Sequence, residues 1–126
     1  MTVRRVVPNF RSRQPGASRE FYCDVLGFDV GMDMDWIVTF VSTSNRTAQI
    51  SLIREDATAP VHPDASVEVE DVDAVHGQAV ERDLEIVYPL SDEPWGVRRF
   101  FVRDPNGMVI NVMSHLDAEE PSPAGG

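Results

Sequence analysis

The order of predicted secondary structure repeats once along the chain, and this repeat is the feature that most constrains the fold. The first half predicts a strand, a helix and three further strands, at residues 3–10, 15–26, 28–32, 36–41 and 48–53. The second half predicts the same order at residues 65–69, 72–80, 85–90, 97–102 and 108–114. Two modules, 3–54 and 64–115, are therefore expected within one domain of residues 1–116.

Residues with clear local preferences mark the ends of both predicted helices. Pro15 suits the first turn of a helix, where its missing N–H is not needed, and Gly27 is typical of a helix end. Asp71 is a plausible N-cap for the second helix. Because the apolar residues of each helix recur at helical spacing, each helix is predicted to bury one stripe against a sheet.

The ratio of helices to strands leaves one face of the predicted sheet uncovered. Each module has one helix for four strands, so the helix covers one face only. We therefore predict an α+β fold in which two tandem βαβββ modules form a curved mixed sheet, with helices on the outer face and a cleft on the inner face. A concave apolar face is costly in water unless it binds something, so the cleft is the predicted ligand site.

The last two predicted strands indicate which side chains line this cleft. Pro105-Asn106-Gly107 fits a three-residue hairpin loop with a left-handed glycine. Such a loop pairs Asn111 with Phe101 and places both on the concave face, as one apolar wall and one orienting amide. By alternation Arg99 shares that face. There it would receive a ligand carboxylate or phosphate, or form a salt bridge with one of the many acidic residues.

Charge and composition narrow the partners and the compartment. The formal net charge of −10 argues against nucleic acid, because phosphates select basic surfaces. It would favour a cationic ligand, or it serves only to keep the protein soluble. No run of about eighteen apolar residues and no signal peptide is found, so neither a membrane span nor export is expected. The lone Cys23 allows no internal disulfide, which fits the cytoplasm, and it is expected to be a packed thiol.

Two segments and three histidines lie outside the predicted pocket. A linker is predicted at 55–63, and the tail 117–126, rich in Glu, Pro, Ala and Gly, is predicted to be disordered. His62 shares a strand face with Asp64, which makes a ligand pair conceivable, but a linker histidine is the simpler interpretation. His76 is expected to be structural, and His115 to be exposed at the end of the last strand.

Three segments carry a resemblance to a known family: SREFYCDVLGF at 18–28, VEVEDVD at 67–73 and FVRDPNG at 101–107. Over roughly residues 3–114 the chain resembles the vicinal oxygen chelate superfamily, which includes glyoxalase I, extradiol dioxygenases and bleomycin-resistance proteins. The resemblance implies the two-module fold and, in metal-using members, four ligands that are typically His, Gln or Glu. The matching positions here are Val7, Ser51, Asp64 and Asn111.

Only Asp64 of these four is a good donor for a divalent ion, so the resemblance implies a member with no metal and no cofactor.

Phe101 stands where the dioxygenases carry a tyrosine. Trp36 and Trp95 occupy similar places in the two modules; they would stack on a planar or cationic ligand, or pack in the core or at a dimer contact. The sequence does not decide which side chains of 36–41 face the cleft. Ten residues are predicted to bind the ligand: Val7, Asn9, Trp36, Phe40, Ser51, Asp64, Trp95, Arg99, Phe101 and Asn111.

Two functions of different classes remain open. The first is a binding protein, a cytoplasmic homodimer that holds a small planar or cationic molecule without a metal, for example to sequester a drug. The second is a metal-dependent lyase, isomerase or dioxygenase of the glyoxalase type. The first is preferred because the ligand positions lack ligand residues, and whether the protein catalyses a reaction stays open.

Overall fold

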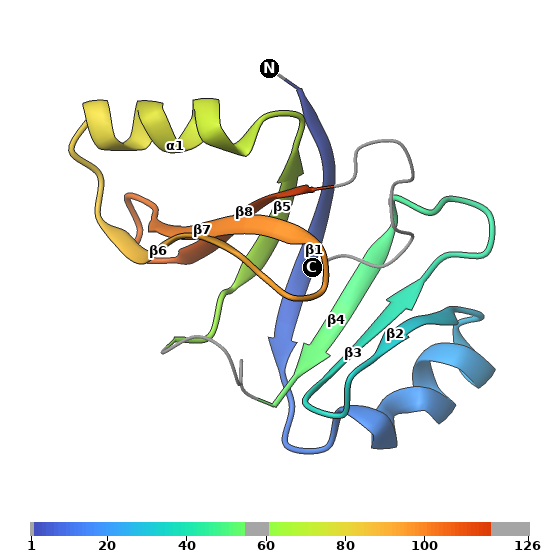
Figure 1. The fold of residues 1–126 in the computed structure, drawn as a ribbon. Helices are drawn as coiled ribbons and strands as arrows, with labels where there is room; N and C mark the ends of the chain where they lie inside the picture. Colours follow the sequence, from blue (N-terminus) through green and yellow to red (C-terminus); the bar gives the residue numbers. More distant parts are fainter. Residues whose placement is uncertain (1, 55–60, 117–126) are drawn as a thin grey trace.

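The computed structural model describes residues 2–54 and 61–116. In these ranges the chain forms eight strands and two helical regions, and Figure 1 shows their arrangement. The strands are β1 (Val3–Arg11), β2 (Asp29–Asp33), β3 (Ile37–Val41), β4 (Gln49–Ile53), β5 (Ala65–Val69), β6 (Ile86–Asp92), β7 (Val97–Arg103) and β8 (Val109–His115). The helix α1 spans Val72–Glu81. The predicted tail and most of the predicted linker lie outside the described residues.

The first predicted helix forms as two shorter pieces. A 3₁₀ helix spans Pro15–Ser18, and a π-helix follows at Glu20–Val25. The wider winding is visible in the bond from Leu26 N–H to Phe21 O, which spans five residues. Gly27 ends the segment with φ of +85°, as its position in the sequence predicts.

The eight strands form one open mixed sheet in the order β2-β3-β4-β1-β5-β8-β7-β6. The two modules join where β1 and β5 run antiparallel, and each of these strands pairs in parallel with the last strand of its own module. This arrangement confirms the predicted α+β fold and places the two modules edge to edge in a single chain.

The register of the central strands is symmetric. In the first module Asn9 pairs with Ser51, and in the second Ser66 pairs with Asn111. Because Val7 pairs with Ser66 across the β1–β5 junction, the four polar residues lie around the centre of the sheet. All four are buried. The expected equivalence of Ser51 and Asn111 is therefore visible in the register.

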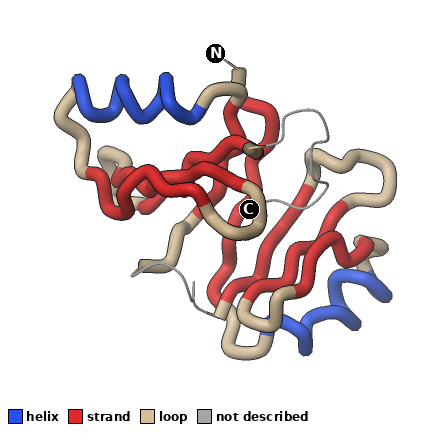
Figure 2. Tube along the Cα trace, viewed as in Figure 1, coloured by secondary structure: helices blue, strands red, loops and turns tan. Residues whose placement is uncertain are grey.

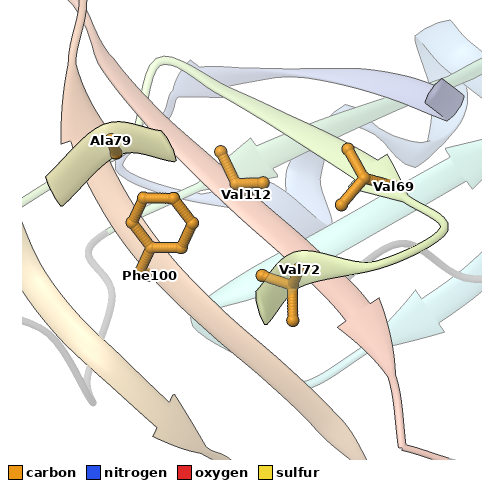
Figure 3. Close-up of a cluster of buried hydrophobic side chains, with 5 residues drawn as sticks. All are labelled: Val69, Val72, Ala79, Phe100 and Val112. Atoms are coloured by element: carbon orange, nitrogen blue, oxygen red, sulfur yellow. The ribbon is translucent and has the colours of Figure 1, made fainter. Parts of the chain in front are cut away.

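The helical regions lie on the outer sides of the two half-sheets and well apart from each other (Figure 2). Under α1, Phe100 and Val112 pack with Val72 and Ala79 in one core (Figure 3). Under the π-helix, Val38, Phe40 and Leu52 form a second core, on which Tyr22 and Cys23 pack. The opposite faces of the same strands are left for the cleft. Within the described ranges, no helix has the length and apolar character to cross a bilayer.

Side-chain caps fix two of the turns that the sequence predicts. Asp71 accepts a hydrogen bond from Ala74 N–H and so caps α1. In the last hairpin, Asp104 accepts from the N–H groups of Asn106 and Met108, both at 2.8 Å, and Gly107 adopts φ of +86°. These backbone donors lower the pKa of Asp104. The resulting loop pairs Phe101 with Asn111, as predicted.

Candidate functional site

A pocket opens on the concave face between the two modules. Both modules supply described residues of its lining. The lining residues are Asn9, Met32, Met34, Trp36, Ile37, Ile53, Pro63, Ser66, Trp95, Arg99 and Asn111. Most of this surface is apolar, with four polar side chains among it, which is the usual composition of a site for a small organic molecule.

The first module supplies a flexible apolar wall. A tight turn between β2 and β3 carries Met34 and Trp36, and Asp35 within it adopts φ of +69°. The turn is closed by bonds from Met34 N–H to Ile37 O and from Trp36 N–H to Met34 O. Methionine side chains adapt to irregular shapes, and the indole offers a flat face. This wall therefore suits a planar ligand.

The second module supplies a rigid wall built around one arginine. The Arg99 guanidinium lies 4.9–5.1 Å from the ring centres of Tyr88, Trp95 and Phe101. Its Nε is 2.6 Å from Glu93 Oε2, and Tyr88 donates a hydrogen bond to the same oxygen at 2.9 Å. Arg99 is only 2% exposed, so this ion pair is nearly dry. Of the two roles predicted for Arg99, the structure shows the salt bridge.

The floor of the pocket is a short row of polar side chains from three neighbouring strands. Asn9 on β1 and Asn111 on β8 each donate a side-chain N–H to Ser66 Oγ on β5, both at 3.0 Å. All three residues are at most 5% exposed. The row is rigid because each partner is held by the other. Among the lining residues that the structure describes, it is the polar part besides Arg99.

Five of the ten predicted ligand residues are brought together at this pocket: Asn9, Trp36, Trp95, Arg99 and Asn111. Phe101 shares the concave face but lies beneath Arg99 and is fully buried. Ser51 lies beside the pocket, with its hydroxyl 2.7 Å from that of Thr39. Val7 is buried in the same face, between Arg5 and Asn9 on β1.

Phe40 and Asp64 are not placed as predicted. Phe40 belongs to the core on the outer face, where its ring stacks on Tyr22 at 4.9 Å. Successive strand residues alternate between faces, so Ile37 and Thr39 face the cleft and Phe40 cannot. Asp64 is exposed, and its Oδ2 accepts a hydrogen bond from Val109 N–H at 2.8 Å. Its carboxylate therefore fixes the start of β5 against β8.

Sequence reasoning missed six lining residues, namely Met32, Met34, Ile37, Ile53, Pro63 and Ser66. Ile37 and Ile53 pair directly across β3 and β4, and would have followed from the correct face assignment. Ser66 would have followed from the repeat, because it occupies in β5 the place that Asn9 occupies in β1. Nothing local in the sequence marks the two methionines.

The histidines have local roles. His62 Nε2 lies 2.9 Å from Asn9 O, which ties the end of the linker to β1. His76 packs edge-on against Phe100, as a structural residue would. His115 is not exposed as predicted, because its Nδ1 lies 2.9 Å from Glu68 Oε2 in a half-buried position.

That contact belongs to a second polar cluster on the concave face, beyond the pocket. Glu68 also lies 2.9 Å from Arg5 Nη2, and Arg5 Nη1 donates to Gln49 Oε1 at 3.3 Å. Burial raises the pKa of Glu68, but the hydrogen bond from His115 and the charge of Arg5 outweigh it, so the net pKa is lowered. Burial also lowers the pKa of Arg5. The cluster joins β1, β4, β5 and β8.

The side chains at the four implied metal positions do not fit a divalent ion. Val7 has no donor, Ser51 is paired with Thr39, the Asn111 amide donates to Ser66, and Asp64 is exposed and engaged with Val109. Within residues 2–54 and 61–116, no group of three or more His, Cys, Asp or Glu side chains could hold a metal ion. A divalent ion prefers imidazole or carboxylate ligands to amides and hydroxyls that are already bonded.

Comparisons with known proteins agree with this fold. The sequence of residues 5–112 matches the family model of the Glyoxalase/Bleomycin resistance protein/Dioxygenase superfamily. A superfamily member from Vibrio splendidus has 22% identity and a TM-score of 0.66, covering 90% of this chain and 99% of that one. A search of curated proteins gives no significant match.

Two similar structures are enzymes. Streptomyces coelicolor methylmalonyl-CoA epimerase, in complex with 2-nitronate-propionyl-CoA, has 19% identity and a TM-score of 0.67, covering 95% of this chain and 100% of that one. A Mn(II)-bound glyoxalase from Novosphingobium aromaticivorans has 18% identity and a TM-score of 0.61, covering 98% of this chain and 40% of that one. At such identities these structures support the fold alone.

Proposed function

Since the chain belongs to the Glyoxalase/Bleomycin resistance protein/Dioxygenase superfamily, we propose that it is a binding protein whose pocket holds a small planar organic molecule without a metal ion. The observation that carries the proposal is the pocket lining. Two indoles, two methionines and two isoleucines surround a space that ends in a bonded amide–hydroxyl row. Such a lining gains free energy by burying apolar ligand surface and orients the ligand through a few polar groups.

The lining favours a planar ligand over a cationic one. Among the lining residues that the structure describes none is acidic, so a buried cation would have no direct counter-charge from them. Glu93, which lies against the aromatic wall, is engaged by Arg99 and Tyr88. The net charge of −10 would then act at long range, on solubility and on approach of the ligand. Sequestration of an aromatic drug in a reducing cytoplasm is the role we assign to such binding.

A homodimer is a separate part of the proposal. Val6 and Phe10 on β1 are each 52% exposed, and they lie on the outer face of the sheet, between the two helical regions. A second copy of the chain that covers this strand would bury them. Val6 and Phe10 are not among the described residues that line the pocket, so this contact would lie apart from them. Sedimentation at micromolar concentration tests the dimer, and a purely monomeric mass would contradict it.

The two tryptophans of the chain give a direct assay of binding, because both line the pocket. In ¹⁵N–¹H spectra of the labelled protein, their two indole N–H signals should move together when a planar aromatic compound is added. A ligand at a hundred times its Kd should also add about 2.7 kcal/mol to the free energy of unfolding. Failure of every compound in a broad aromatic panel to do either would refute the proposed function.

The enzymatic alternative is tested with metals. Protein purified without chelator is analysed for bound ions, and then titrated with nickel, zinc, manganese and iron salts. A stoichiometric tightly bound ion that shifts the indole signals of Trp36 and Trp95 would favour a glyoxalase-type enzyme over the binding protein proposed here. Weak, substoichiometric binding that leaves those signals unchanged would support the proposal.

A further inference from the structure

Ser66 has an unusual hydrogen-bonding state for a pocket residue. Its Oγ accepts two hydrogen bonds, from Asn9 Nδ2 and Asn111 Nδ2, both at 3.0 Å. A serine hydroxyl has two acceptor lone pairs and one O–H donor. With both lone pairs occupied, what remains is the donor. In the described part of the chain, both side chains that contact this hydroxyl reach it through their amide N–H groups.

The arrangement of the strands limits the directions in which the Ser66 O–H can point. Strand β5 lies between β1 and β8, so the two amides reach Ser66 from its two sides within the sheet. Because both amides donate to the oxygen, the O–H can turn toward the pocket that Ser66 lines. Ser66 is 3% exposed, so bulk water has little access to this donor. An unsatisfied buried donor costs free energy, which a suitable ligand would recover.

We infer that Ser66 is the specificity-determining residue of the pocket, and that it selects uncharged planar compounds carrying a carbonyl oxygen. This inference rests on the proposed function and adds the class of ligand. A carbonyl oxygen accepts one hydrogen bond from the single O–H donor of Ser66. An uncharged ligand suits the described lining, because the cation in it, Arg99, is already paired with Glu93. The apolar walls hold the ring system, and the carbonyl lies over β5.

Three compounds with one carbon skeleton test the inference on the full chain. Indane has no polar group, 1-indanone carries a carbonyl acceptor, and 1-aminoindane is a cation at neutral pH. Each is titrated into labelled protein, and its Kd is taken from the shifts of the two indole N–H signals. Comparing ratios of Kd between variants removes the intrinsic difference in hydrophobicity between the compounds.

The variant is Ser66→Cys, which keeps an atom of similar size between the two amides but is a much weaker donor. The matched control is Ser51→Cys, at a buried serine of the first module whose hydroxyl pairs with Thr39 and which is not a lining residue. Relative to wild type, the preference for 1-indanone over indane should fall by about three- to tenfold in Ser66→Cys. It should be unchanged in Ser51→Cys.

A measurement on the wild-type protein covers the case in which Ser66→Cys does not fold. The infrared carbonyl stretch of bound 1-indanone should lie at lower frequency than in an alkane solvent, because the carbonyl accepts a hydrogen bond. An unshifted stretch, or a preference that is equal in wild type and Ser66→Cys, would overturn the inference while leaving the binding function in place. Tighter binding of 1-aminoindane than of 1-indanone would also overturn it. If none of the three compounds binds, the inference fails, and the proposed function is then decided by the broad aromatic panel.

Discussion

Replacing Glu93 tests whether the pocket wall depends on a buried ion pair. Glu93 and Arg99 are 8% and 2% exposed, and their charged atoms are 2.6 Å apart. Glu93→Gln keeps the shape but removes the negative charge, so the guanidinium keeps only a neutral partner. Hydrogen bonds to charged groups contribute about 1.5–3 kcal/mol, and breaking a buried pair completely costs about 3–5 kcal/mol. Because Gln still accepts and three rings still contact Arg99, we expect a loss of about 2 kcal/mol.

The assay is urea unfolding at pH 7, followed by tryptophan fluorescence, with thermal unfolding in parallel. A loss of about 2 kcal/mol should lower the melting temperature by roughly 6–12 °C for a domain of this size. Glu85→Gln is the matched control, because Glu85 pairs with Arg103 at 3.2 Å on the surface. Exposed pairs contribute little, so the control should lose less than about 1 kcal/mol.

Two results would refute this reasoning. One is a loss in Glu93→Gln no larger than that in Glu85→Gln, which would mean that burial does not strengthen the pair. The other concerns the double variant Glu93→Gln/Arg99→Met, which removes the uncompensated charge and should recover part of the stability. If the double variant is less stable than Glu93→Gln by more than about 2 kcal/mol, the ring contacts of Arg99 dominate and the ion pair is secondary.

Three further predictions follow from other parts of the molecule. Phe40→Ala should lower the free energy of unfolding by about 3–5 kcal/mol in urea titrations, while the Kd of a pocket ligand, measured on the folded fraction, stays unchanged. The lowered pKa of Glu68 means that its interactions stabilise the fold above its ordinary value of 4.5 and are lost as pH falls below it. Stability measured from pH 7 to pH 3 should therefore fall less steeply in Glu68→Gln, and equal slopes would contradict this. Gly107→Ala should cost about 1–2 kcal/mol of stability, because φ of +86° disfavours a side chain, and a neutral result would show that the loop relaxes.

Local signals in the sequence were sufficient for much of the fold. The repeated element order, the cap at Asp71 and the left-handed glycines 27 and 107 are all present in the structure. The hairpin loop before Val109 even fixes the pairing of Phe101 with Asn111, because a three-residue loop allows one register only. These features depend on a few adjacent residues, whose preferences do not change with the rest of the chain.

Tertiary packing decided most of the pocket. Which face Phe40 takes depends on Tyr22, a residue of another element, and no turn in the sequence fixes it. From the sequence alone, Arg99 could contact either a ligand or an acidic side chain. The fold decides for the acid, because the turn before β7 places Glu93 Oε2 2.6 Å from Arg99 Nε. The sequence itself determined the two modules and the amphipathic strands, because hydrophobic periodicity is local. Only the antiparallel joining of β1 and β5 brought Asn9, Ser66 and Asn111 into one bonded row, because contacts between distant segments depend on register and packing in three dimensions.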